Sequence, residues 1–180
     1  NEIKASLPEL PSIKKERFIE SYKLKSTDAE VLTASKQLAD FYEKVKQLTE
    51  IDSQIVANWI IGDYTAALNK DDLDIVDSKI SATDLAGLLN KIADQTISGK
   101  IAKEVFDAMW KGEGSAEEII ERKGLVQITD DSEIENIVNQ VIENNPSQVK
   151  DYLDGKSQLL GYFVGQIMKE TKGKANPKKV

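Results

Sequence analysis

Residues 55–68 read IVANWIIGDYTAAL, and this stretch determines the fold class of the chain. Its apolar residues recur at intervals of one, three and four, and they are Ile55, Val56, Trp59, Ile60, Tyr64 and Leu68. That spacing places them on one face of an α-helix, whereas a half-buried strand would alternate strictly between apolar and polar residues. We expect this helix to lie at the centre of a first hydrophobic core.

The helical period continues on both sides of this stretch. Residues that can cap a helix start precede most apolar segments, and they are Ser35, Ser81, Ser98 and Ser115. Thr27, Ser81 and Ser115 are each followed three residues later by an acid, which predicts capping boxes. Residues 125–128, Leu-Val-Gln-Ile, could form a strand, but an isolated strand has no partner, so an extended linker is expected. The pattern predicts an all-α protein.

Two glycines suggest how the chain divides. Gly112 and Gly114 follow the end of a predicted helix and precede the capping residue Ser115. We therefore predict two small helical lobes, with a helical domain over residues 1–112 and a compact tail domain over residues 113–180.

Charge is distributed very unevenly along the chain. The 180 residues carry 24 basic and 31 acidic side chains, a net charge of −7. From Lys156 to Val180, however, there are six lysines and one acid, which gives +5, and the remaining residues sum to −12. Because polyanion binding depends on the local positive field, the tail can bind nucleic acid despite the acidic total.

Composition excludes several function classes. The chain has no Cys and no His, which removes disulfides, the common zinc sites and Ser-His or Cys-His nucleophile pairs. No apolar run is long enough to cross a bilayer, so no membrane partner is expected. The absence of Cys fits a reducing compartment, and the expected location is the cytoplasm. Residues 155–157, Gly-Lys-Ser, resemble the end of a phosphate-binding loop. That loop needs a glycine at position 150, which is Lys, and no strand precedes it.

The basic tail supplies the first set of candidate binding residues. Phosphate contacts are expected from Lys169, Lys172, Lys174, Lys178 and Lys179, with Gly173 and Asn176 shaping the loop. Gly173 is also placed to follow the last helix as its C′ residue. Lysine offers a point charge without the planar fork of arginine, so these residues would position a backbone and would not read bases. A basic tail that only solubilises the protein is the alternative.

A second candidate set lies at a predicted helix start and consists of Ser98, Gly99, Lys100 and Lys103. Lysines in the first turn of a helix oppose the helix dipole. A capping serine, a glycine that exposes the backbone and two lysines would together suit a phosphate. The alternative is an ordinary helix cap with solvated lysines.

Six ordered motifs resemble a known family across almost the whole chain. They are Leu7-Pro8-Glu9-Leu10-Pro11, Asp28-Ala29-Glu30-Val31-Leu32, Ala57-Asn58-Trp59-Ile60, Ile97-Ser98-Gly99-Lys100-Ile101-Ala102-Lys103, Lys123-Gly124-Leu125-Val126-Gln127-Ile128 and the stretch 165–177. The chain resembles the C-terminal half of the B subunit of the bacterial glutamyl-tRNA(Gln)/aspartyl-tRNA(Asn) amidotransferases. The same region is similar to the stand-alone YqeY-like proteins.

The resemblance implies a division of labour. In that family an N-terminal cradle of the B subunit binds ATP and magnesium and activates the carboxylate on misacylated tRNA, while the A subunit, an amidase, supplies ammonia. A small C subunit completes the enzyme. The helical and tail domains hold the outer corner of the tRNA, on its D-loop side. This chain is expected to begin where the cradle ends and to carry no catalytic residue, metal or cofactor of its own.

Two other functions stay open at this point. The chain could be a protein-interaction module that docks partner subunits or a synthetase with little RNA contact. It could also be an independent enzyme, which would need a carboxylate or lysine site because histidine and cysteine are absent. DNA is not an expected partner.

Overall fold

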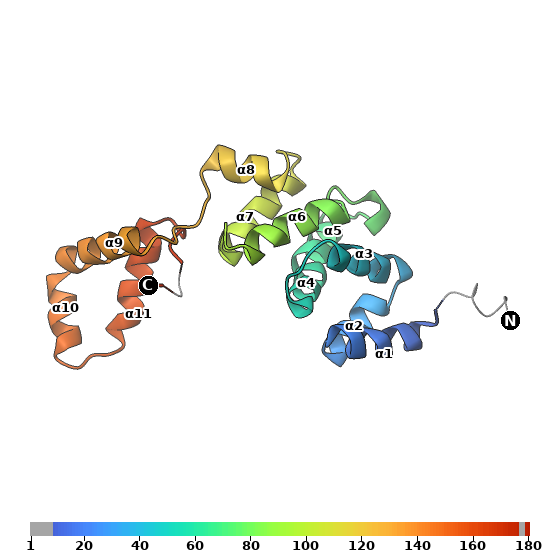
Figure 1. Cartoon of the computed structure of the whole chain (residues 1–180), viewed down its shortest axis with the longest axis horizontal. Helices are drawn as coiled ribbons and strands as arrows, with labels where there is room; N and C mark the ends of the chain where they lie inside the picture. The colour runs from blue at the N-terminus through green and yellow to red at the C-terminus, as the bar shows by residue number, and fades with distance from the viewer. Residues whose placement is uncertain (1–8, 177–178) are drawn as a thin grey trace.

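The computed structural model describes residues 9–176 and 179–180. In this part of the chain the regular structure is helical, which confirms the all-α class, and β-pairing is limited to an isolated bridge between Ile128 and Ala175. Figure 1 shows the helices α1 to α8 in one group and α9 to α11 in another. We call residues 9–125 the first lobe, residues 126–130 the linker and the rest the tail lobe.

The first lobe contains α1 (Pro11–Tyr22), α2 (Ser26–Thr33), α3 (Lys36–Gln47), α4 (Ser53–Trp59), the π-helical turn η2 (Ile60–Tyr64), α5 (Thr65–Lys70), the 3-10 turn η3 (Ile75–Asp77), α6 (Ala82–Ala93), α7 (Gly99–Trp110) and α8 (Ala116–Lys123). The tail lobe contains α9 (Asp131–Asn144), α10 (Pro146–Leu153) and α11 (Leu159–Glu170).

The stretch that sets the fold class is helical throughout, as predicted, but it includes one wide turn. The segments α4, η2 and α5 follow one another without a break. The carbonyl of Ile60 accepts the backbone N–H of Thr65, five residues later, and the Thr65 hydroxyl donates a second hydrogen bond of 2.7 Å to the same carbonyl. Tyr64, fully buried here, stacks on Phe41 with 4.4 Å between ring centroids. The central helix is therefore fixed against α3 by aromatic packing.

The predicted helix starts on α3, α6, α7 and α8 are confirmed. Ser35, Ser81, Ser98 and Ser115 each accept a hydrogen bond from the backbone N–H three residues later. Ser81 and Ser115 form full capping boxes with Asp84 and Glu118. These caps satisfy N–H groups that a helix cannot pair internally. The capping box predicted for Thr27 and Glu30 is wrong, because α2 begins at Ser26 and has no side-chain cap.

Helix α8 packs on the first lobe. Its residues Ile119 and Ile120 are buried in the same cluster as the α6 and α7 core residues, and Leu125 follows them into it. Gly112 and Gly114 have positive φ values of 78° and 132°, so the chain does turn sharply there. The domain boundary at residues 112/113 stays a prediction, and the packing of α8 gives a reason to test it.

The tail lobe has a small hydrophobic cluster of its own. Val141 on α9, Ile167 on α11 and Ala175 in the C-terminal segment are buried together. Ile137, Val138, Phe163, Met168 and Val180 pack around them. Within the described residues, this cluster is separate from the core of the first lobe.

Candidate nucleic-acid interface

The first candidate set lies on the end of α11 and the loop after it. The helix ends with the N–H of Lys172 bonded to the carbonyl of Lys169 and the N–H of Gly173 bonded to the carbonyl of Met168. This is the Schellman pattern, and it makes Lys172 the C′ residue and Gly173 the C″ residue. The predicted C′ position of Gly173 was therefore wrong by one residue. Lys172 itself adopts the left-handed conformation, with φ 53°.

Buried polar groups hold the loop that follows. The hydroxyl of Thr171 donates to the carbonyl of Ile167 at 2.8 Å and accepts the N–H of Ala175 at 3.2 Å. The loop also pairs with the linker, because the N–H of Ile128 donates to the carbonyl of Lys174 and the N–H of Asn176 donates to the carbonyl of Ile128. Asn176 is buried, so its place is in the framework of the loop.

The second candidate set lies at the start of α7. Ser98 caps this helix through the N–H of Ile101, and Gly99 and Lys100 are exposed in its first turn. Lys103, one turn further, pairs with Asp63 of η2 at 3.0 Å and lies 6.0 Å above the Trp59 ring. A phosphate that used Lys103 would have to compete with Asp63.

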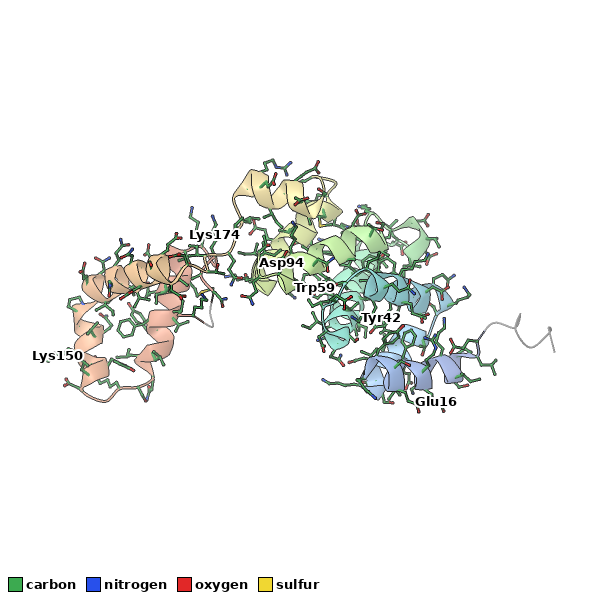
Figure 2. All side chains as sticks on the ribbon, viewed as in Figure 1. Glu16, Tyr42, Trp59, Asp94, Lys150 and Lys174 are labelled. Atoms are coloured by element: carbon green, nitrogen blue, oxygen red, sulfur yellow. The ribbon has the colours of Figure 1, made fainter. Side chains whose placement is uncertain are left out.

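The structure brings the two candidate sets together at the junction of the lobes. A side-chain carbon placed on Gly173 would lie 3.7 Å from Cδ and 3.8 Å from Nζ of Lys100, so the Lys100 chain runs along this glycine. The linker joins the same two regions, since the N–H of Gln127 donates to the carbonyl of Thr96 at 2.7 Å. Figure 2 labels Lys174 and Asp94 on the two sides of this junction.

The lysines at the junction differ in their ion pairs. Among the described residues, no ion pair is made by Lys100, Lys169, Lys172 or Lys174. Lys179, in contrast, bonds to the Asp131 carboxylate and to the carbonyl of Thr129, each at 2.7 Å, which fastens the C-terminal segment to the start of α9. Lys178 lies outside the described residues. The lysines without carboxylate partners are the ones best placed to meet a phosphate.

Sequence reasoning missed the residues that assemble the junction. Thr96 was not among the candidate residues, and Gln127 and Ile128 were expected only to lie in a linker. The available signal was Gln127 itself, a polar residue inside the apolar run 125–128 that is 9% exposed in the structure. A buried polar residue in a linker indicates that the linker is docked against something.

Asp94 supports the position of the Thr96 loop. Its carboxylate accepts the N–H of Thr96 at 2.9 Å. Partial burial raises the pKa of the Asp94 carboxyl, but the hydrogen bonds from Thr96 outweigh this effect and leave the pKa below its usual value. The carboxylate is thus ionised at neutral pH and holds the backbone whose carbonyl receives Gln127.

Other polar features have structural partners. Gly155, Lys156 and Ser157 form the turn between α10 and α11, where Lys156 pairs with Asp151 at 3.1 Å, so this segment is not folded as a phosphate loop. A cavity of about 430 Å³ near Trp110 is lined by both acidic and basic side chains. One of them, Asp71, accepts hydrogen bonds from Lys79 and from the Trp110 indole.

The described part of the chain has neither a membrane-spanning helix nor a cluster of metal-binding side chains. No helix in residues 9–176 and 179–180 is long and apolar enough to span a bilayer. No three His, Cys, Asp or Glu side chains within those same residues gather in an arrangement that could hold a metal ion.

Comparison with known proteins adds independent information. A protein-family model described as the GatB domain matches residues 40–180. The chain is 52% identical over 178 residues to the B subunit of the aspartyl/glutamyl-tRNA(Asn/Gln) amidotransferase of Thioalkalivibrio sulfidiphilus, which covers 99% of this chain and 37% of that protein. The protein of the same name from Coxiella burnetii (strain RSA 493 / Nine Mile phase I) is 52% identical over 179 residues, covering 99% of this chain and 38% of that protein.

A third relative, from Nitrosococcus oceani, carries the same name and is 49% identical over 180 residues, covering 100% of this chain and 38% of its own length. The chain thus spans less than two fifths of the length of the curated relatives it matches, and the match lies in their C-terminal part.

Proposed function

The chain belongs to the GatB domain family, and we propose on this basis that it is the tRNA-binding region of the B subunit of a glutamyl-tRNA(Gln)/aspartyl-tRNA(Asn) amidotransferase. In this role it holds the outer corner of misacylated tRNA, on the D-loop side. The parent enzyme is an ATP-dependent ligase of cytoplasmic protein synthesis. The cradle with its ATP and magnesium, the amidase subunit and the small third subunit belong to the same proposal.

One observation carries the RNA-binding part of the proposal. In an acidic protein, Lys100 of one predicted group lies against Gly173 of the other at the lobe junction, and Lys100, Lys172 and Lys174 have no carboxylate partner among the described residues. A cluster of unneutralised cations attracts a polyanion locally, whatever the total charge. Binding then gains free energy from the counterions that leave the phosphates.

The recognition expected here is of shape and backbone. Lysine ammonium groups contact phosphates without reading bases, and folded RNA is recognised largely through its shape and its sugar–phosphate backbone. Such contacts suit a task in which several tRNAs with a common outer corner must be held. The aminoacylated end would be delivered to chemistry outside this chain.

Binding of the 180-residue chain to tRNA(Gln) and tRNA(Asn) at rising salt tests the proposal. Lys100, Lys169, Lys172 and Lys174 make no ion pair among the described residues. If each of these four lysines meets a phosphate, the logarithm of the affinity should fall with the logarithm of salt concentration with a slope of about −3. The double variant Lys172→Glu/Lys174→Glu should weaken binding strongly and flatten this slope.

A matched control has the same change in charge at other sites. Lys44→Glu/Lys150→Glu alters two exposed lysines that make no ion pair among the described residues, and Lys150 lies at the end of the tail lobe far from the junction in Figure 2. This control should retain most of the affinity. Absence of binding at low salt, or equal losses in the two double variants, would contradict the proposal.

A protein-docking role is the second candidate, and a specific feature favours it. A largely apolar cavity of about 290 Å³ lies in the tail lobe, and Leu153 and Leu160 at its edge are 77% and 56% exposed. Exposed apolar residues around a cavity are typical of interaction sites. Normal binding to the other amidotransferase subunits by a chain that fails to bind tRNA would favour this role.

A further inference from the structure

The linker contacts both lobes through adjacent residues. The N–H of Gln127 points to Thr96 of the first lobe, while the N–H of Ile128 points to Lys174 of the tail lobe. Successive residues of an extended chain direct their side chains and backbone groups to opposite sides. The linker therefore lies between the lobes as a shared strand-like segment, with one backbone hydrogen bond to the first lobe and two to the tail lobe.

The contact between Lys100 and Gly173 lies beside this segment. Gly173 is buried although it sits in a surface loop, and Lys100 of the first lobe covers part of it. The neighbours of Gly173 in sequence are Lys172 and Lys174. Docking of the lobes thus places the Lys100 side chain against the glycine that separates Lys172 from Lys174 in the loop.

The positive charge at this place has no counter-charge in the described residues, because no described carboxylate forms an ion pair with any of these three lysines. The local field is therefore positive and attracts an anion. A phosphate backbone that contacts Lys100 on one lobe and Lys172 or Lys174 on the other would be attracted by both lobes at once, so it would stabilise the docked arrangement.

We propose that Lys100, Lys172 and Lys174 bind one continuous stretch of RNA phosphate backbone across the lobe junction, so that RNA binding and docking of the two lobes are coupled. The inference rests on the proposed function, because it takes tRNA as the ligand. It adds that the binding surface belongs to neither lobe alone and that Gln127 is a positioning residue. Thermodynamic linkage makes this coupling reciprocal. An interaction that stabilises the docked arrangement raises the affinity for RNA, and bound RNA stabilises the docked arrangement to the same extent.

The first test removes the Lys100 charge in two backgrounds. In the otherwise unaltered chain, Lys100→Gln should reduce the salt slope of tRNA binding by about 1. Gln127→Pro deletes the N–H that bonds to Thr96 and should lower tRNA affinity about fivefold or more. In the Gln127→Pro background, Lys100→Gln should have no further effect, whereas Lys174→Gln should still weaken binding.

Val126→Pro is the matched control. It introduces the same residue one position earlier, at an exposed site whose N–H forms no hydrogen bond with a described residue. Lys100→Gln should keep its full effect in the Val126→Pro background. Urea unfolding followed by Trp fluorescence and circular dichroism identifies any variant that fails to fold.

A second measurement does not depend on affinity. Because the chain contains no Cys, the substitutions Glu104→Cys on α7 and Asn139→Cys on α9 allow two spin labels to report the distance between the lobes. Addition of tRNA should narrow the distance distribution in the unaltered background, and less so with Lys100→Gln.

The outcomes separate the inference from the proposed function. If Lys172→Glu/Lys174→Glu weakens tRNA binding but Lys100→Gln does not, the binding site lies on the tail lobe alone and the inference is wrong. An unchanged distance distribution on tRNA binding would also overturn it. If none of these lysines affects tRNA binding, the proposed function itself fails.

Discussion

At the scale of single residues, Lys172 combines an unfavourable backbone conformation with a favourable charge. It occupies the C′ position of α11 with φ 53°, which a residue with a side chain adopts at a cost of roughly 1 kcal/mol. Glycine adopts the same conformation without that cost. Lys172→Gly should therefore raise the free energy of unfolding of the tail lobe by up to about 1 kcal/mol while lowering tRNA affinity. Urea unfolding by circular dichroism and equilibrium binding measure the two effects.

Lys23→Gly is the control, because Lys23 holds the same conformation after α1, with φ 56°. It should stabilise the first lobe and leave tRNA binding unchanged. Since stability and affinity move in opposite directions for Lys172→Gly, unfolding cannot explain a loss of binding. A stabilised variant that kept full affinity would remove Lys172 from the candidate interface.

Capping residues could be predicted from the sequence because their hydrogen bonds are local. Ser81 and Ser115 bond to groups three residues away, and residue type at that spacing finds them, although the same pattern at Thr27 and Glu30 forms no capping box. The residue at which α11 ends was harder to predict from the sequence. A glycine after a helix is expected at the C′ position, and here Gly173 occupies the position after it. Local patterns identify that a helix ends, and its packing decides at which residue.

At the scale of elements, α8 decides where the chain divides. The sequence places a boundary before α8, at the glycines 112 and 114, because glycines mark turns. The structure buries Ile119 of α8 completely in the first-lobe core. Ile119→Ala removes a large buried side chain and should cost the first lobe about 2–5 kcal/mol. Trp59 and Trp110, the two Trp residues of the chain, belong to this lobe, so their fluorescence should report an earlier urea transition.

Val141→Ala provides the comparison on the other lobe. Val141 is buried in the tail-lobe cluster, so its truncation should destabilise that lobe. The part of the circular dichroism change that belongs to the tail lobe should then occur at a lower urea concentration, while the urea midpoint of the Trp fluorescence transition stays the same. If Ile119→Ala left the Trp transition unchanged, α8 would belong with the tail and the boundary at residues 112/113 would be supported.

At the scale of the whole molecule, the sequence indicated both lysine groups but not their meeting. Ser98 to Lys103 and Lys169 to Lys179 are separated by about 70 positions, and neither group contains a signal for the other. Their approach depends on Gln127 and Ile128, whose backbone hydrogen bonds can be made by any residue except proline. Because such backbone interactions do not require particular residue types, the sequence did not predict that the two lysine groups approach each other.

The ionised carboxyl groups determine how the stability of the molecule should change at low pH. Several carboxyl groups of the first lobe have a pKa below the usual value because of hydrogen bonds or ion pairs, and they include Glu9, Asp40, Asp71 and Glu118. For Asp40 the main cause is the hydrogen bond from Lys36, and Lys14 contributes as well. A group with a lowered pKa in the folded state stabilises the fold above its unfolded pKa, near 4 for Asp, and loses this contribution as pH falls through the folded value.

The first lobe should consequently lose stability as pH drops below about 4, when the folded-state carboxylates take up protons. Urea unfolding followed by Trp fluorescence, from pH 6 to pH 2.5, measures this loss. Asp40→Asn should make the curve less steep, because the amide no longer titrates. Asp107→Asn changes the net charge equally but affects an exposed carboxylate that makes no ion pair among the described residues. General repulsion in the increasingly positive protein acts on both variants alike, so the difference between their curves isolates the contribution of the Lys14–Asp40–Lys36 group. Identical curves for the two variants would show that this group does not stabilise the fold.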